Sequence, residues 1–420
     1  MQEHLGTSVL PGLNKDLLSR CVTSTDLQNP DILANPCDEN GLVQRAELVL
    51  RFGFASLNIE PISIRGNTAH CIRSTQHTLV LRGLNQILRK TTNIQPADRD
   101  TIIRRLITIL REGVQHRVYK FDIRSFFESL DTGLLLKELW LVPEIPRNAV
   151  TTLANYFQEL RDRDIPGLPR GIQLSATLSE FALRQFDREI SLLPDVYFHA
   201  RYVDDIIIIT GARENAKEFA RSIRDLLPYG LKFNNEKTKR IDLPAFTKGQ
   251  ANGVVDQFDY LGYRFLMHPV ERSPTDNRFH RKVGVTIADK KVRRIKSRIC
   301  LAVCQYLQDS DSVALEQRLQ LLTGNHNLQD FSTGRSRNVG LWSNYKRVNS
   351  FEALAELDSF LRSVLVGNKS HIANRFALSA PAKARQYLLR YGFVDNFKAR
   401  PFYNFPTYKL SELRRCWQNV

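Results

Sequence analysis

Two adjacent aspartates, Asp204 and Asp205, interrupt the most apolar part of the chain. Residues 197–203 before them and 206–210 after them are rich in aromatic and β-branched side chains, which is typical of strands. This pattern predicts a hairpin with both carboxylates at its tip. Asp is also a common turn residue, so a bare pair would indicate no more than an Asx-type turn. Because the flanking strands are so apolar, we instead expect the carboxylates to project from a buried sheet, where neighbouring like charges repel and a cation is the usual remedy.

A third aspartate is delivered by an upstream strand. Residues 118–121 form a short apolar pattern that ends at Asp122, after which the spacing of apolar residues becomes helical. Three carboxylates at neighbouring strand ends suit two Mg²⁺ ions about 4 Å apart, arranged for in-line displacement at phosphorus. Mg²⁺ prefers oxygen ligands and keeps several waters, so three carboxylates and the substrate phosphates would be sufficient.

Five segments in series resemble motifs A to E of the reverse transcriptase palm. They are FDIRSFF from Phe121, GLPRGIQLS from Gly167, YVDD from Tyr202, LKFNNEKT from Leu231 and FDYLGY from Phe258. Each motif is weak alone, but five in this order across residues 119–265 are highly specific. The resemblance implies an α+β right-hand polymerase fold, with fingers, a palm made of an antiparallel sheet plus helices, and a helical thumb with a C-terminal helical extension.

The resemblance also assigns roles to individual residues. Asp122, Asp204 and Asp205, with the backbone carbonyl of Ile123, would hold two Mg²⁺ ions (Mn²⁺ being an alternative). Lys237 would protonate the pyrophosphate leaving group, unless it is only a surface lysine. The residues expected to bind the dNTP are Arg65, Arg73, Phe127, Arg170, Gly171 and Ser175. Those expected to bind primer and other nucleic acid are Leu261, Gly262, Lys290, Lys291, Arg294 and Arg298.

For several of the residues expected to bind the dNTP, the side chain itself indicates a role and an alternative to it. Phe127 occupies the position where, in the family, a ring packs under the sugar and excludes a 2′-hydroxyl, so it favours dNTPs over rNTPs; alternatively it belongs to the core, like its neighbour Phe126. Arg170 replaces the Gln that the family most often has before Gly171, and its charge puts ordinary template handling in question. Arg65 and Arg73 do not stand in the clear Arg-x-x-x-Pro pattern of the family. Each could equally be a solvated loop arginine instead of a ligand of the triphosphate.

A basic helix expected over residues 286–308 is the clearest nucleic-acid element outside the palm. Its apolar stripe is Ala288, Val292, Ile295, Ile299 and Val303, and six cations occupy the other faces. As a thumb helix it would neutralise duplex phosphates, although a merely solvated basic face is the alternative. A second helix is expected over residues 351–366. Residues 385–417 interleave aromatic and basic side chains, which either stack on single-stranded RNA or form a small aromatic core.

The composition agrees with a nucleic-acid partner. The chain has 60 Lys and Arg against 44 Asp and Glu, a net charge of +16, and a pI near 9.7. Such an excess points to a polyanion. No apolar run reaches transmembrane length, the first residues lack a signal-peptide layout, and the six cysteines form no CxxC pair. We therefore expect reduced thiols, a cytoplasmic location and no membrane partner.

The expected organisation has five parts. They are an N-terminal extension (1–45), fingers (46–118), a palm with finger insertions (119–270), a thumb-like helical domain (280–366) and a basic, aromatic C-terminal extension (367–420). No added catalytic run for an RNase H, integrase or HNH nuclease is found, and the motifs of retron enzymes are not evident.

What remains resembles the stand-alone bacterial reverse transcriptases of anti-phage defence, of the abortive-infection and defence-associated types. The subgroup expected is one of the paired enzymes of the two-reverse-transcriptase (type 3) systems. The implied partners are a dedicated non-coding RNA template, dNTPs, the DNA product, and a second reverse transcriptase or another copy of the chain. Two alternatives are an RNA-dependent RNA polymerase, against which Phe127 and YVDD argue, and a catalytically idle RNA-binding scaffold, against which the three aspartates argue.

Overall fold

The structure is a computed structural model that describes residues 12–64, 66–94, 98–248, 253–274, 278–330 and 335–418. The chain folds into two units that are interleaved along the sequence. The first contains residues up to 98 and residues 117–240, whereas the second contains residues 99–116 and, apart from a short loop segment, the chain from residue 241 onwards. The five-part division expected from the sequence stays a prediction.

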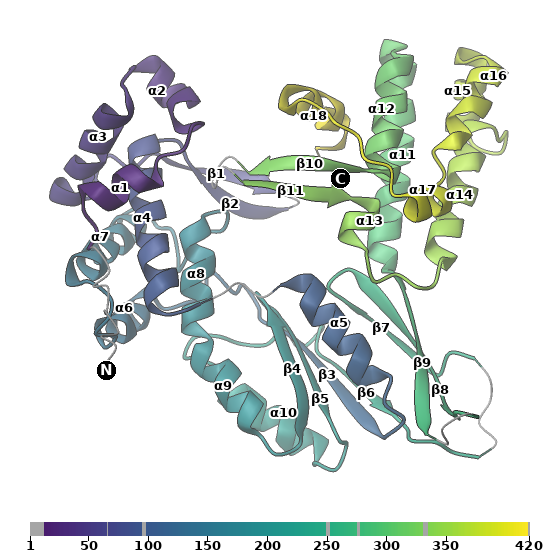
Figure 1. The fold of residues 1–420 in the computed structure, drawn as a ribbon, viewed down its shortest axis with the longest axis horizontal. Coiled ribbons are helices and arrows are strands. Elements are labelled where there is room, and N and C mark those ends of the chain that lie inside the picture. Colours follow the sequence, from purple (N-terminus) through teal and green to yellow (C-terminus); the bar gives the residue numbers. More distant parts are fainter. Residues whose placement is uncertain are drawn as a thin grey trace, which may run out of the picture. The chain divides into compact units, whose positions relative to one another are not determined.

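The apolar runs around the paired aspartates form two neighbouring strands of a four-stranded sheet, one at its edge and one inside it (Figure 1). Its strands, in the order β4-β5-β3-β6, are β4 (Val196–Tyr202), β5 (Asp205–Thr210), β3 (His116–Asp122) and β6 (Lys239–Leu243). β5 pairs antiparallel with both β3 and β4. All four isoleucines of β5 are completely buried, which explains why this strand is apolar along its whole length instead of alternating.

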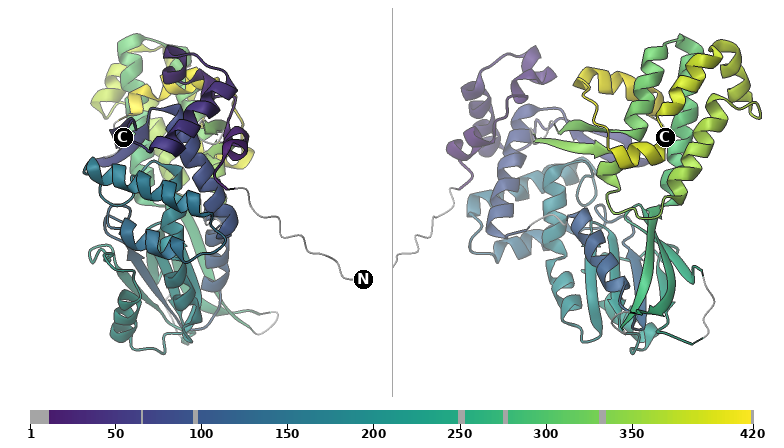
Figure 2. Two further views of the ribbon diagram at one scale, coloured as in Figure 1. Left: turned by 90° about the vertical axis from the view of Figure 1, so that its left-hand side faces the viewer. Right: turned by 45° about the vertical axis from the view of Figure 1, so that its right-hand side comes forward.

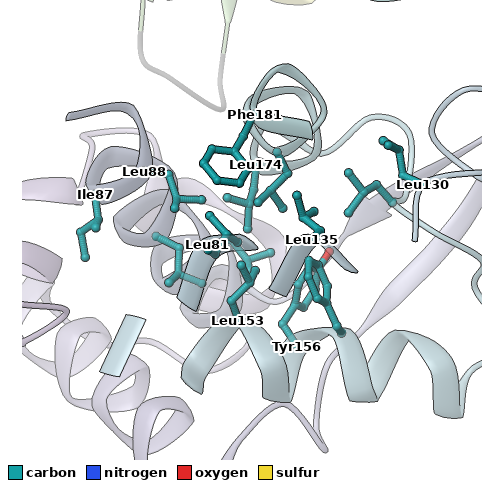
Figure 3. Packing of buried hydrophobic residues seen from close by; sticks show 14 of the residues in the cluster. Leu81, Ile87, Leu88, Leu130, Leu135, Leu153, Tyr156, Leu174 and Phe181 are labelled. Carbon is teal, nitrogen blue, oxygen red and sulfur yellow. The ribbon is translucent and has the colours of Figure 1, made fainter. Parts of the chain in front are cut away.

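Helices form the rest of the first unit. They are α1 (Lys15–Cys21), η1 (Asp26–Gln28), α2 (Pro30–Ala34), α3 (Glu39–Phe52), α4 (Thr75–Thr91), α6 (Thr132–Trp140), α7 (Arg147–Asp162), α8 (Gln173–Ala182), α9 (Arg184–Leu192) and α10 (Ala216–Asp225). A hairpin of β1 (Ile59–Ile64) and β2 (Asn67–Ile72) precedes α4. Figure 3 shows the apolar faces of α4, α7 and α8 meeting at Leu81, Leu153 and Leu174. This core holds the loop before α8 in place.

The second unit combines a three-stranded sheet with a helical bundle (Figure 2). The sheet has the order β7 (Asp256–Tyr260), β8 (Tyr263–Arg272), β9 (Phe279–Ile287), and α5 (Arg99–Leu110) packs against β9. The bundle is built around α11 (Asp289–Asp309), which packs on α12 (Ser312–Thr323) and α14 (Glu352–Leu365). The remaining elements are β10 (Asn325–Asp330), β11 (Arg335–Gly340), α13 (Leu341–Asn344), α15 (His371–Ser379), α16 (Ala382–Tyr387), η2 (Leu388–Arg390), α17 (Phe393–Ala399), α18 (Thr407–Arg414) and η3 (Arg415–Trp417).

The mixed helices and antiparallel sheets confirm the predicted α+β class and are consistent with a right-hand polymerase architecture. Local boundaries differ from the expectation in several places. The helix expected from Ser175 begins at Gln173, the helix expected from residue 286 begins at Asp289, and Tyr263 begins β8 instead of lying in the preceding turn. In the thumb-like region, residues 325–330 and 335–340 form a pair of antiparallel strands. Within the described ranges, no helix combines the length and the apolar character that crossing a membrane requires.

Candidate active site

The strand register brings the three aspartates to the same end of two neighbouring strands in the sheet of the first unit. Asp122, the last residue of β3, lies directly opposite Asp205, the first residue of β5, and Asp205 also faces Tyr202 of β4. Asp204 lies in the turn between β4 and β5, and its carbonyl accepts a hydrogen bond of 3.1 Å from the Ile123 N–H. The predicted hairpin is therefore present, with one of the two acids in the turn and the other at the start of a strand.

The turn itself is conformationally unusual. Val203 has φ of 61°, in the left-handed region that a β-branched residue rarely occupies. Such backbone conformations cost of the order of 1–3 kcal/mol and persist where the surrounding structure holds them. Here the partly buried β4 and the buried β5 on either side hold the turn, so the sheet fixes where Asp204 lies. This strain could not be predicted from the sequence, because Val in a YVDD segment fits an ordinary strand end.

Burial and mutual repulsion raise the pKa values of two of these aspartates. Burial raises the pKa of Asp205 to about 6, and the neighbouring Asp204 charge adds to the increase. Burial also raises the pKa of Asp204, with the Asp122 charge acting in the same direction. Asp122 itself is only 9% exposed. A cation placed among these groups would relieve both the repulsion and the cost of burial.

Lys237 supplies part of that positive charge. Its Nζ lies 2.9 Å and 3.0 Å from the two carboxylate oxygens of Asp122, and this hydrogen bonding raises the lysine pKa. The segment that carries it is tied to the same strand end, because the Asn234 N–H donates to the Asp122 carbonyl at 2.7 Å. The sequence suggested either a general acid or a surface lysine. The structure makes Lys237 a contact of the carboxylate group, while most of its side chain is exposed.

The donor set suits a hard divalent cation. Carboxylate oxygens from two adjacent strands, together with the Ile123 backbone, are the ligands that Mg²⁺ prefers, and the Lys237 ammonium already occupies a cation's place beside Asp122. Among the residues that the structure describes, no three carboxylate, imidazole or thiol side chains are gathered tightly enough to form a ready metal site. The residues therefore fit the ion in chemistry, and closing the site around it requires side-chain movement.

Phe127, Arg170 and Glu128 form a second cluster beside the aspartates. Glu128 was not among the residues expected from the sequence. Phe126 is fully buried and belongs to the core, whereas Phe127 is only partly buried. The Arg170 guanidinium lies 5.6 Å from the centre of the Phe127 ring. It also forms a two-point ion pair with Glu128, with Nε–Oε1 at 2.5 Å and Nη2–Oε2 at 3.0 Å. Burial acts to raise the pKa of Glu128, but the Arg170 hydrogen bond, the Glu128 backbone and the charges of Arg170 and His70 together outweigh it, and the pKa is lowered.

The glycine after Arg170 is required by close backbone packing. Gly171 has φ of +93°, and a Cβ there would lie 2.7 Å from the carbonyl oxygen of His70. The His70 N–H donates to the Arg170 carbonyl at 2.7 Å, so strand β2 is held against this loop. Ser175 follows in the first turn of α8 and is buried, 2% exposed. The structure thus brings together the β1–β2 hairpin, Phe127 and the loop before α8 that carries Gly171 (the glycine loop). The Ser175 N–H donates to the Ile172 carbonyl at 3.1 Å.

Of the two candidate triphosphate arginines, the structure describes only Arg73. Arg73 is exposed at the end of β2 and pairs with Glu60 of β1 at 2.8 Å, rather than with any of the three aspartates. Arg65 lies outside the described residues. Both assignments stay predictions.

The expected primer-binding hairpin belongs to the second unit and has a tightly fixed tip. Leu261 and Gly262 have φ of 47° and 82°, as in the two-residue turns that join β-strands. Arg99 donates to the Leu261 carbonyl through Nε at 2.9 Å and Nη2 at 2.6 Å, and its Nη1 donates to the Asn344 carbonyl at 2.6 Å. Its guanidinium also lies 4.7 Å from the centre of the Tyr263 ring. Sequence reasoning missed Arg99, since its partners are far away in the chain.

The basic helix is α11 in the second unit. Ala288, Val292, Ile299 and Val303 of its apolar stripe are buried, as expected. Lys290 is exposed, whereas Lys291, Arg294 and Arg298 are partly buried. The Arg298 guanidinium lies 5.5 Å from the centre of the Trp417 ring, and its carbonyl accepts from the Trp417 indole N–H at 2.9 Å. Only part of this basic face is therefore solvated.

Residues 71–265 match the family model described as "Reverse transcriptase (RNA-dependent DNA polymerase)". This part of the chain is therefore similar to reverse transcriptase domains, and Asp122, Asp204 and Asp205 all lie within the matched residues. Comparison with curated protein sequences gives no significant match.

Solved structures similar to this chain include telomerases from two yeasts. They are apo telomerase from Candida tropicalis (TM-score 0.40, 11% identity, 86% of this chain and 64% of that chain), telomerase from Candida tropicalis with the TWJ fragment of telomeric RNA (0.38, 13%, 87% and 64%), and the corresponding Candida albicans complex (0.36, 13%, 86% and 64%). The chain thus spans less than two thirds of the length of each of these structures.

Proposed function

We propose that this chain is an RNA-directed DNA polymerase that extends a primer with dNTPs by two-metal phosphoryl transfer. One observation carries the proposal: β3 and β5 place Asp122 opposite Asp205, with Asp204 in the adjoining turn, within the residues that match the reverse transcriptase family. An idle scaffold has no need for three neighbouring acids at these strand ends, because burying like charges close together costs stability.

The chain's own residues divide the work. Asp122, Asp204, Asp205 and the Ile123 carbonyl would hold the Mg²⁺ or Mn²⁺ ions. When bound, these ions would supply the positive charge that stabilises the attacking and leaving oxygens. Lys237 carries a proton that it can donate to the pyrophosphate once its ammonium leaves Asp122. Phe127, half-buried beside the glycine loop, orients the sugar and excludes a 2′-hydroxyl.

The biological setting is part of the same proposal. The motif order resembles stand-alone bacterial enzymes of anti-phage defence, and the net charge of +16 supports a nucleic-acid partner. We place the chain in the bacterial cytoplasm, copying a dedicated non-coding RNA into DNA. It would act with a second reverse transcriptase, as in the type 3 paired systems, or with another copy of itself.

The test is the double variant Asp204→Asn with Asp205→Asn. We expect it to lose dNTP incorporation on a primed RNA template, because the paired negative charges are removed while the side-chain shapes are kept. The matched control is Glu218→Gln with Asp225→Asn, two exposed acids of α10. Primer extension measures activity, and the thermal midpoint shows whether each variant is folded. A folded double variant that still extends primers would overturn the proposal, and rNTP reactions run alongside distinguish an RNA polymerase.

A further inference from the structure

A groove in the second unit lies between the β10–β11 hairpin and α18, which are neighbours in Figure 1. Its volume is about 600 Å³, within the range of small-molecule and nucleotide sites. The lining residues are Asn327, Leu328, Ser336, Phe405, Thr407, Leu410, Ser411, Arg414 and Gln418. Among these described residues there is one cation, one aromatic ring, three hydroxyls and two amides, and there is no carboxylate.

Arg414 is the charged group of this groove, and its partner is not an acid. Its Nη2 lies 2.7 Å from Nε2 of His326, a residue that is only 4% exposed. Arginine can only donate, so Nε2 is the acceptor and the imidazole is neutral with its proton on Nδ1. Burial and the Arg414 charge lower the pKa of His326 to about 4, in agreement with a neutral ring. The described contacts of Arg414 thus leave its positive charge without a negative partner.

A partly buried cation without a counter-ion is costly, and burial here lowers the pKa of Arg414. The cost is recovered if an anion enters the groove. Phosphate is the anion that matches a guanidinium best, through paired N–H donors. The guanidinium keeps donors available for it, because one nitrogen is used by His326.

The other side of the groove fits a base. The Phe405 ring is partly exposed and is held by contacts with the Tyr403 and His326 rings, at centroid distances of 6.3 Å and 6.5 Å. A fixed, half-exposed ring offers a stacking surface to any base. The hydroxyls of Ser336, Thr407 and Ser411 and the two amides can then bond base edges and sugar oxygens.

We infer that this groove binds a nucleotide unit of single-stranded nucleic acid, with the base on Phe405 and the phosphate at Arg414. The inference rests on the proposed function, which gives the chain a single-stranded template to hold. The C-terminal extension, with its aromatic and basic residues, would then bind single strands at this groove. α11 is expected to bind a duplex elsewhere in the same unit.

The experiment measures binding of the full chain to a fluorescent single-stranded RNA 12-mer and to a blunt duplex of the same length, by anisotropy across a salt series. Phe405→Leu keeps apolar volume but removes the stacking face, and we expect single-strand binding to weaken about tenfold. Arg414→Gln should reduce the salt slope for the single strand by about 0.7, the amount for one phosphate contact. Duplex binding should not change in either variant.

Matched controls are Phe402→Leu and Arg415→Gln, exposed residues of the same segment that do not line the groove. A third variant, Ser411→Phe, fills the groove from an exposed position and tests the site if either of the first two fails to fold. Competition with a free mononucleotide shows whether the groove takes a strand or a single nucleotide; displacement of the RNA 12-mer at micromolar mononucleotide would favour the latter.

Groove variants that bind single strands as tightly as the wild type, with the same salt slope, would overturn the inference. The outcome is independent of the proposed polymerase activity. A wild type that does not extend primers would contradict the proposed function, whereas this measurement requires no catalysis and concerns binding alone.

Discussion

Arg170 shows how a single departure from a family pattern is absorbed locally. The sequence raised the concern that an arginine before Gly171 adds charge where a template base is handled. In the structure its guanidinium is committed to Glu128 in two hydrogen bonds and lies over the Phe127 ring. The charges of Arg170 and Glu128 offset each other, and the pair lies next to the Phe127 ring.

Truncating Phe127 tests discrimination between sugars. We expect Phe127→Ala to raise incorporation of rNTPs relative to dNTPs by on the order of tenfold or more, because the ring that would clash with a 2′-hydroxyl is gone. Parallel primer-extension series with each nucleotide set give the ratio. Phe246→Ala, which removes an exposed ring of the second unit, should leave the ratio unchanged. An unaltered ratio for Phe127→Ala would return that ring to a packing role.

The raised pKa of Asp205 makes the stability of the metal-free protein depend on pH. An aspartate has a pKa near 3.9 when unfolded, and Asp205 has one of about 6 when folded. The protonated form is favoured by the fold, so this contribution is fully present below about pH 4 and is lost as the pH rises through 6. It amounts to at most about 3 kcal/mol.

In urea unfolding without divalent ions, the stability of the wild type relative to Asp205→Asn should therefore fall as the pH rises from 4 to 6. The comparison isolates Asp205, because histidines such as His326, whose pKa is lowered to about 4, titrate in the same window in both proteins. Asp225→Asn on α10 should follow the wild type at every pH. Above pH 6, Mg²⁺ should raise the thermal midpoint of the wild type, since it binds the ionised form, and the increase should be absent in Asp205→Asn. A variant profile that overlays the wild type would show that Asp205 does not carry the strain.

At the scale of elements, α11 has both a packing face and a cationic face. Replacing Lys290, Arg294 and Arg298 by Gln removes three cations spaced four residues apart. If each meets a phosphate, the slope of log affinity for a hybrid duplex against log salt should shrink by about 2 to 3 units. The control is Arg362, Arg375 and Lys383 replaced by Gln, three exposed cations of other helices. Parallel slopes for wild type and α11 variant would mean that this face is only solvated.

Helices and strands that show an apolar run or stripe in their own residues could be predicted from the sequence. Contacts between segments far apart in the chain could not. β3, β5, α11 and α14 follow directly from their apolar runs or stripes. The grip of Arg99 on Leu261 and the Lys237–Asp122 pair join residues far apart in the chain, and no local pattern indicates them. The β10–β11 hairpin was missed because its strands carry few β-branched or aromatic residues. Glu128 had a usable signal, an acid next to Phe127 that matches the unexpected Arg170.

The whole molecule carries a charge of +16, and this has a direct consequence for purification. We expect the protein isolated at low salt to retain nucleic acid and to release it in about 1 M NaCl, where counter-ion release no longer favours binding. The ratio of absorbance at 260 and 280 nm measures this. Sequencing the released material tests the dedicated-RNA proposal. One dominant RNA supports it, while a mixture that mirrors bulk cellular RNA contradicts it.

The interleaving of the two units sets an order of events for a chain that is being synthesised. α5 emerges early, yet it belongs to the second unit, where Ile103, Leu106 and Leu110 are buried and the Arg281 N–H donates to the Arg111 carbonyl at 2.7 Å. Its partner strand β9 ends at Ile287. The apolar face of α5 therefore lacks this partner until all five palm motifs and β9 have been synthesised. The first unit can close its core during that interval, and the second cannot. A pause or truncation before residue 287 would leave a ribosome-bound chain with a formed polymerase sheet and one exposed, aggregation-prone helix.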